Sequence, residues 1–222
     1  MRTKLIDRQL PHYTKGEEIF NSISHIVGGV IGIVALLSCV VISVKHENTI
    51  GIVSSAIYGF SMILLYIMSS IYHGLPKGTA KKVMQIIDHC SVYVLIAGTY
   101  TPILLCSLRN YNNVLGWSFF GVEWGFAILS IILNAIDLKN FSVFSMISNI
   151  VMGWGLIFIL PIAIKVLTND GFMIVLLGGI FYTVGAILYG IGVKKSYMHC
   201  VFHIFVILGS VAHLYAIMFY VL

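Results

Sequence analysis

Long apolar runs separated by short polar breaks occupy most of the chain. The runs lie at 23–44, 50–73, 85–107, 114–136, 141–166, 171–193 and 199–221. A bilayer core about 30 Å thick needs roughly 20 apolar residues per helix. Helices are the economical spanning form for such runs, because the hydrocarbon offers no water to satisfy backbone groups. The pattern predicts an all-α integral membrane protein, a bundle of seven transmembrane helices.

Composition leaves little room for a soluble domain. Of the 222 residues, 59% are hydrophobic and 9% are charged, whereas soluble domains carry roughly 25% charged residues. We expect one domain, 1–222, with a short cytoplasmic segment, 1–21. This segment is polar and lacks the apolar stretch and cleavage site of a secretory signal peptide. The four cysteines form no C-x-x-C pair, so neither a disulfide framework nor a Cys-based zinc site is indicated.

Lys and Arg are spread unevenly over the breaks between the runs. Alternate breaks lie on the same side of a membrane, so ten basic residues share one side and three share the other. Because cytoplasmic loops carry the excess of Lys and Arg, we expect a cytoplasmic N-terminus and an external C-terminus in the cell membrane. The net charge is +5, but we do not interpret it as a basic patch for nucleic acid, and no nucleic-acid partner is expected. The predicted cytoplasmic residues are Arg2, Lys4, Arg8, Lys15, Lys77, Lys81, Lys82, Lys139, Lys194 and Lys195, and the external ones are Lys45, Arg109 and Lys165.

Six ionisable side chains inside the runs gather at one depth. Such residues are rare in membrane spans and mark functional sites. With the orientation above, these six fall in the cytoplasmic leaflet, at the start of runs one, three and seven and at the end of run two. They are His25, His73, Asp88, His89, His199 and His203.

The spacing of these residues indicates a metal centre. His199 and His203 are four residues apart, which places both on one face of a helix. Three imidazoles and an open fourth position are typical of catalytic zinc, and His73 would be the third ligand. Zinc lowers the pKa of a bound water to about 7. Asp88 would orient that water or accept its proton, and Ser69 would donate a hydrogen bond to an oxyanion or to the water.

Other interpretations stay open at this point. A membrane histidine often serves only as a hydrogen bond between helices, and iron, nickel or copper also bind imidazole. His89 lies about 100° around the helix from Asp88, so one of the two faces the site, and Asp88 is favoured. We expect His213 to be a buried hydrogen bond or to line a pocket, and Glu123 to be neutral or paired.

Three motifs resemble the hemolysin III proteins, the bacterial branch of the progestin and adipoQ receptor superfamily. They are Glu18-x-x-Asn21-x-x-x-His25, Ser69-x-x-x-His73 followed by Asp88, and His199-x-x-x-His203. The resemblance implies seven transmembrane helices and zinc near the cytoplasmic ends. It also implies His73, His199 and His203 as ligands and Asp88 as the holder of a zinc-bound water. Glu18, Asn21 and His25 carry over as motif residues without a chemical step.

Three functions follow as hypotheses. The first is a zinc-dependent intramembrane hydrolase that cleaves a lipid amide or ester, ceramidase-like by resemblance, with a membrane lipid as its substrate. The second is a non-enzymatic membrane-homeostasis or sensor protein in which zinc is structural. The third is a haemolytic pore, which the pattern favours least, because a pore needs a polar stripe through the membrane and the polar residues here gather at one depth.

Overall fold

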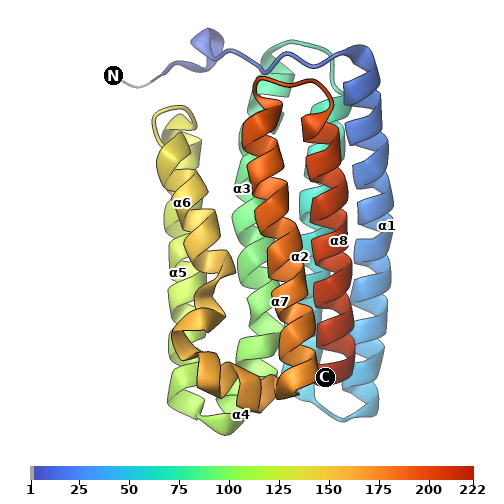
Figure 1. The fold of residues 1–222 in the computed structure, drawn as a ribbon, viewed down its shortest axis with the longest axis vertical. Helices are drawn as coiled ribbons and strands as arrows, with labels where there is room; N and C mark the ends of the chain where they lie inside the picture. The colour runs from blue at the N-terminus through green and yellow to red at the C-terminus, as the bar shows by residue number, and fades with distance from the viewer. Residues whose placement is uncertain (1–2) are drawn as a thin grey trace.

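Helices that stand side by side make up the computed structural model, which describes residues 3–222 (Figure 1). No strand occurs among these residues. The long helices are α1 (Lys15–Lys45), α2 (Thr49–Gly74), α3 (Thr79–Pro102), α5 (Asn113–Asp137), α6 (Ser142–Gly153), α7 (Leu160–Gly192) and α8 (Met198–Tyr220). Short segments are the 3-10 helices η1 (Leu5–Asp7) and η3 (Gly155–Ile159), the π-helical η2 (Ile103–Leu108) and α4 (Arg109–Tyr111).

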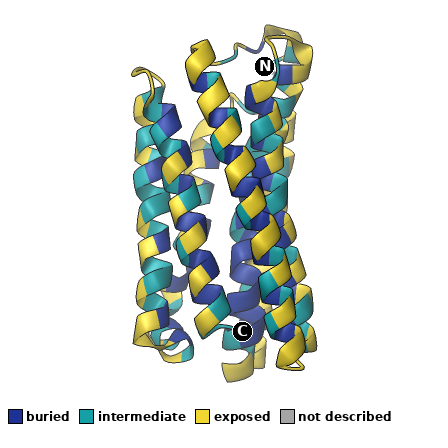
Figure 2. Ribbon diagram, turned by 90° about the vertical axis from the view of Figure 1, so that its right-hand side faces the viewer, coloured by how far each residue is buried: buried dark blue, intermediate teal, exposed yellow. Residues whose placement is uncertain are grey.

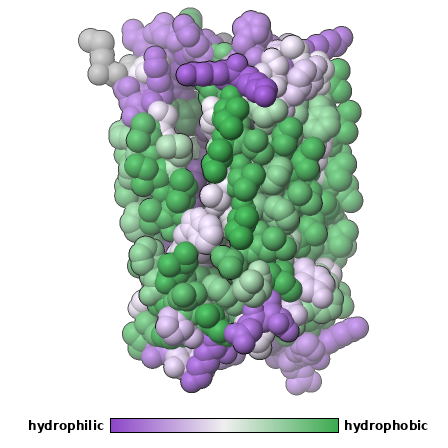
Figure 3. All heavy atoms as spheres, in the orientation of Figure 1, coloured by the Kyte–Doolittle hydropathy of each residue, from purple (hydrophilic) through white to green (hydrophobic). Residues whose placement is uncertain are grey.

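The prediction of an all-helical membrane protein is confirmed. Six helices are long and apolar enough to cross a membrane: Lys15–Lys45, Thr49–Gly74, Thr79–Tyr111, Asn113–Asp137, Gly155–Gly192 and Met198–Tyr220. Buried residues follow the inward faces of the helices (Figure 2). On the face drawn in Figure 3, an apolar band covers the middle and polar residues gather at both ends. Many large aliphatic side chains, such as Leu37 and Val114, point outward, as expected for a surface in contact with lipid.

The predicted fifth run, 141–166, is not one continuous helix. It comprises α6, the 3-10 segment η3 and the first turns of α7. Gly153 and Gly155 lie where the interruption begins, and glycine is a poor helix former. A second interruption lies inside α7 at Thr168, whose φ of 64° is not helical. In Figure 1 the chain before this kink crosses the lower end of the bundle, and the predicted sixth run, 171–193, forms the upright part of α7.

Helix α1 begins at Lys15, within the predicted N-terminal segment, 1–21. Thr14 and Glu17 form a capping box: the Thr14 hydroxyl accepts from the Glu17 backbone, and the Glu17 carboxylate accepts from the Thr14 backbone. This arrangement satisfies two N–H groups that a helix start otherwise leaves free. Glu18, Asn21 and the start of the first run therefore share one helix.

Close packing brings together the elements that carry the motifs. α1 packs along α2, and α7 along α8, while α2 also contacts α3 and α1 contacts α8. Gly28 of α1 permits the approach to α2, since a Cβ there would lie 2.4 Å from the ring of Tyr66. We call the end where α1, α3 and α8 begin and α2 ends the histidine end of the bundle. It is the upper end in Figure 1.

Candidate metal centre

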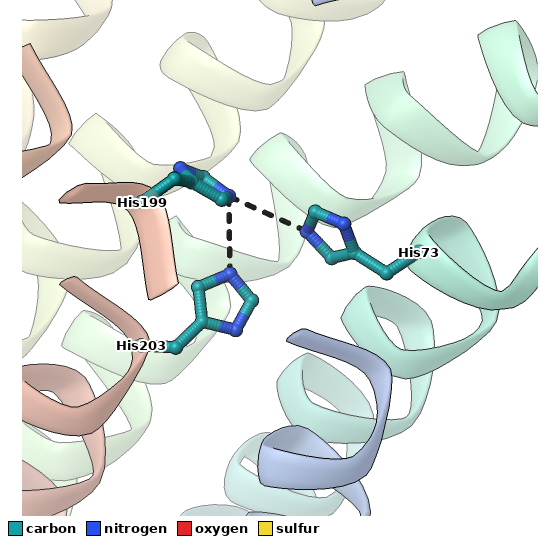
Figure 4. Close-up of side chains that lie close together, drawn as sticks. All are labelled: His73, His199 and His203. Atoms are coloured by element: carbon teal, nitrogen blue, oxygen red, sulfur yellow. Dashed lines mark hydrogen bonds between the residues drawn. The ribbon is translucent and has the colours of Figure 1, made fainter. Parts of the chain in front are cut away.

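Three histidines from two helices converge at the histidine end. His73 lies at the end of α2, and His199 and His203 lie on the first two turns of α8. Their exposed fractions are 2%, 6% and 1%. The Nε2 atom of His199 lies 3.1 Å from that of His203 and 3.4 Å from that of His73 (Figure 4). Each ring offers one nitrogen, and all three nitrogens lie within 4.8 Å of one another.

These spacings fit a tetrahedral metal ion. With Zn–N bonds of about 2.0–2.1 Å, two imidazole nitrogens on tetrahedral zinc lie about 3.3–3.4 Å apart. The two short Nε2 distances of the cluster, 3.1 Å and 3.4 Å, are close to that value. Three neutral imidazoles that direct their Nε2 lone pairs at one another have no N–H among these atoms to form hydrogen bonds. The arrangement therefore favours a cation between them.

Glu18 fixes the orientation of His73. Its carboxylate accepts a hydrogen bond from His73 Nδ1 at 2.7 Å and pairs with Lys81 Nζ at 2.8 Å. A ring that carries its proton on Nδ1 presents a lone pair on Nε2, as a metal ligand requires. A carboxylate behind a ligating histidine is the usual way to fix that tautomer and raise its basicity. Lys81 also donates to the carbonyls of His73 and Leu75, and so holds the end of α2 in place.

The start of α1 fixes His203. Its Nδ1 lies 3.5 Å from the Ser24 hydroxyl, and its ring also reaches the backbone carbonyl of Asn21. The Ser24 contact favours a proton on Nδ1 and leaves Nε2 free. His25 stacks on His203, with ring centroids 3.8 Å apart. Neither nitrogen of His25 has a hydrogen-bond partner in the described part of the chain, and His25 is not among the three converging ligands.

The N-terminal segment covers the centre through Tyr13. The Tyr13 ring stacks on His199 with centroids 4.7 Å apart and lies 5.7 Å from that of His73. Burial, followed by the nearby Tyr72 and Tyr189 phenols, raises the pKa of the Tyr13 hydroxyl above its ordinary value. The phenol is therefore neutral at physiological pH, and its ring shields the imidazoles from water.

Asp88 lies beside the three histidines without joining them. Its carboxylate interacts with the Ser69 hydroxyl and, through charge, with the phenols of Tyr13, Tyr72 and Tyr189. These three tyrosines surround the cluster: Tyr72 lies 4.6 Å from His73 and Tyr189 lies 5.6 Å from His199, measured between ring centroids. The predicted roles of Asp88 and Ser69 stay predictions.

His89, the neighbour of Asp88, lies near the same wall of the site. Its ring contacts Tyr189 across a centroid distance of 6.3 Å. It does not belong to the cluster of three converging nitrogens, and the preference for Asp88 over His89 stays a prediction.

Sequence reasoning missed three residues around the site. Glu17 is 3% exposed, and its carboxylate accepts from the Tyr197 backbone at 2.6 Å at the start of α8. The Thr-x-x-Glu spacing at Thr14 and Glu17 was the available signal. The sequence identifies Lys81 only as a loop charge and gives no signal for Tyr13, because the contacts of both residues with the site form only when the helices assemble.

The fold and the site together define a class: a multi-pass helical membrane protein with a buried cluster of three histidines that can hold a metal ion. The family described as "Haemolysin-III related" matches residues 13–214, and the chain belongs to this family.

Individual relatives agree with this assignment. The chain is 38% identical over 206 residues to "Hemolysin-3" of Bacillus cereus, covering 93% of this chain and 92% of the relative. It is 37% identical over 208 residues to "Hemolysin-3 homolog" of Bacillus subtilis (strain 168), covering 94% and 96%. The human "Monocyte to macrophage differentiation factor" is 23% identical over 175 residues, covering 74% and 69%. The predicted resemblance to the hemolysin III proteins is therefore confirmed, and the distant relative supports the wider superfamily.

Proposed function

We propose that this protein is a zinc-dependent intramembrane hydrolase that cleaves an amide or ester bond of a membrane lipid. The observation that carries the proposal is the convergence of three histidine Nε2 atoms, together with the partly buried Asp88 and its contact with the buried Ser69 hydroxyl. Histidine nitrogens suit zinc, and three protein ligands leave a position open for a water.

Bound zinc would supply Lewis-acid chemistry and lower the pKa of a water to about 7. The chain's own residues would do the rest. Asp88 would accept the proton of the attacking water and pass it to the leaving group. Ser69 would hold the Asp88 carboxylate in place, or turn its hydroxyl to the developing oxyanion. Glu18 would keep His73 in the ligating tautomer.

The same proposal places the site in the cytoplasmic leaflet of the cell membrane. The basic residues of the predicted cytoplasmic side, from Lys4 to Lys195, belong to segments at the histidine end, while Arg2 lies outside the described residues. The described N-terminal segment and the C-terminus lie at opposite ends of the bundle (Figure 1), which supports an odd number of crossings. We count α6, η3 and the start of α7 as the fifth of seven.

Lipid turnover by the purified protein tests the proposal. The protein in nanodiscs is incubated with a panel of ceramides, other lipid amides and lipid esters, and released fatty acid is measured by mass spectrometry. We expect release by the wild type and none by Asp88→Ala. Asp170→Asn, an exposed change far from the site, should keep full activity. No release from any lipid by protein shown to contain zinc would refute the hydrolase.

A second candidate is a non-enzymatic sensor or homeostasis protein with structural zinc. It is favoured by the position of the cluster, because an ion held by His73 and His199 would tie α2 to α8. Chelation should then lower the melting temperature sharply, and no lipid would be cleaved. Lysis, which the names of the Bacillus relatives suggest, has less support, since the buried histidines gather at one end rather than along a channel.

A further inference from the structure

A second buried acid lies far from the histidine cluster. Glu123 of α5 is 5% exposed, and its Oε2 has no hydrogen-bond partner among the residues that the structure describes. Among all the described residues, the ion pairs that form involve Glu18 and not Glu123. The sequence predicts a neutral or a paired carboxyl at this position, and no described residue provides a partner for Oε2.

The Glu123 carboxyl lies against the interrupted fifth crossing. A Cβ placed on Gly155 of η3 would lie 2.6 Å from Glu123 Oε1 and 3.6 Å from the Tyr100 hydroxyl. Glycine at 155 leaves this space to the acid, and a larger residue would make the Glu123 carboxyl shift. Tyr100 in turn donates to the Gly153 carbonyl at 2.9 Å and accepts from the Leu156 backbone at 3.4 Å. The Tyr100 phenol and the Glu123 carboxyl therefore both lie against the backbone where the helix is broken.

A small cavity of about 30 Å³ lies next to the same backbone, and Tyr100 contributes to its wall. Its lining includes Tyr100, Trp154, Leu156 and His213. A site of this size has room for at least one water. His213 Nε2 contacts the Val175 carbonyl at 3.0 Å, so that nitrogen carries the proton and Nδ1 is an acceptor. Nδ1 has no partner in the described chain, which leaves a polar atom at the cavity that a water would satisfy.

The ligand that suits Glu123 is a proton. An ionised carboxylate without a counter-charge is strongly disfavoured in an apolar interior, and such groups become neutral instead. The titratable group that the structure places near it is the Tyr100 phenol of α3. Tyr100 also lines the cavity that the His213 imidazole of α8 lines, and neither group offers a fixed positive charge. A metal cation would need several oxygen ligands, whereas the carboxyl has no partner at Oε2.

We propose that Glu123 is a proton-binding site, separate from the histidine cluster, that exchanges its proton with water beside the broken fifth crossing. Tyr100 lies twelve residues beyond Asp88 along α3, a rise of about 18 Å, so the two acids act in different halves of the bundle. This site does not depend on the proposed hydrolase.

Carbodiimide labelling of the full-length protein in nanodiscs tests the site. Dicyclohexylcarbodiimide is apolar and reacts with protonated carboxyl groups, and peptide mass mapping locates the adduct. We expect modification at Glu123, loss of that adduct in Glu123→Gln, and none at Glu47, which is exposed and ionised in water. A water-soluble carbodiimide should show the opposite preference. Glu123→Gln should keep the zinc content and melting temperature of the wild type, because an amide resembles the neutral acid.

Two results would overturn the proposal. One is an unmodified Glu123 in the folded protein when the same residue is modified after unfolding in detergent, since this would mean an acid that is ionised or sealed from exchange. The other is protection of Glu123 by sodium at constant pH, compared with choline at equal ionic strength. Protection by sodium would identify a metal cation as the ligand.

Discussion

Glu18 connects the charge at the histidine end to the geometry of the ligands. Its carboxylate holds the His73 ring and pairs with Lys81. In Glu18→Gln the amide carries no charge and holds the Nδ1 proton weakly. We expect zinc affinity to fall about 10–100-fold, as for other changes behind a metal-binding histidine. Competition with a chromogenic chelator measures the affinity, with Asp170→Asn as the exposed control. Equal affinities in Glu18→Gln and the wild type would show that the contact has no role in binding.

Tyr13 is expected to control how fast a metal leaves. Because its ring covers His199, Tyr13→Ala should speed the loss of zinc to an external chelator several-fold, while Tyr13→Phe keeps the ring and should behave as the wild type. Stopped-flow absorbance of the chelator follows the loss. If alanine and wild type release zinc at the same rate, the N-terminal segment is not a cover.

For individual residues, the sequence predicted the spacing of side chains along one helix well. It predicted the contacts between side chains of different helices poorly. The spacing of His199 and His203, together with the depth of His73, was sufficient to predict the cluster that the structure brings together. The stacking of His25 on His203 and the pairing of Glu18 with Lys81 depend on how α1 turns toward its neighbours. That rotation is set by packing, which one sequence does not display.

The contact between α1 and α2 offers a test at the scale of elements. In Gly28→Ala the new methyl group would lie 2.4 Å from the Tyr66 ring, so the ring or the helices must shift. Overpacking of this kind costs about 1–3 kcal/mol, and we expect a lower melting temperature. Gly121→Ala on α5 is the matched control, because its methyl group would meet nothing within 4 Å. There the better helix propensity of alanine adds up to about 1 kcal/mol. Equal melting temperatures for the two variants would contradict the packing described here.

The fifth crossing shows where sequence patterns reach their limit for elements. Gly153, Gly155 and Pro161 were visible signals for a helix break, yet the run 141–166 is apolar enough to suggest one span. The hydropathy of a run indicates whether its residues contact lipid. It does not indicate whether the backbone hydrogen bonds of a helix continue without a break. The interruption lies beside Glu123 and Tyr100, and these neighbours from α5 and α3 become visible only once the helices are assembled.

For the whole molecule, the number of crossings is the open prediction. In a background with Cys39, Cys90, Cys106 and Cys200 replaced by alanine, single cysteines are introduced as Glu47→Cys, Asp170→Cys and Lys194→Cys. Seven crossings predict that a membrane-impermeant thiol reagent labels the first two from outside intact cells, and Lys194→Cys only after lysis. If α6 and η3 turn back without crossing, the pattern at 170 and 194 reverses, and the proposed orientation of the C-terminus is wrong.

Metal content tests the central claim of the account most directly. Inductively coupled plasma mass spectrometry is applied to the purified wild type, to His199→Ala, and to His46→Ala, a control at the opposite end of the bundle from the cluster. Three converging nitrogens predict stoichiometric zinc in the wild type and in His46→Ala, and a large loss in His199→Ala, since two histidines hold zinc far less tightly than three. Equal zinc in wild type and His199→Ala would contradict the assignment of this cluster as the metal centre.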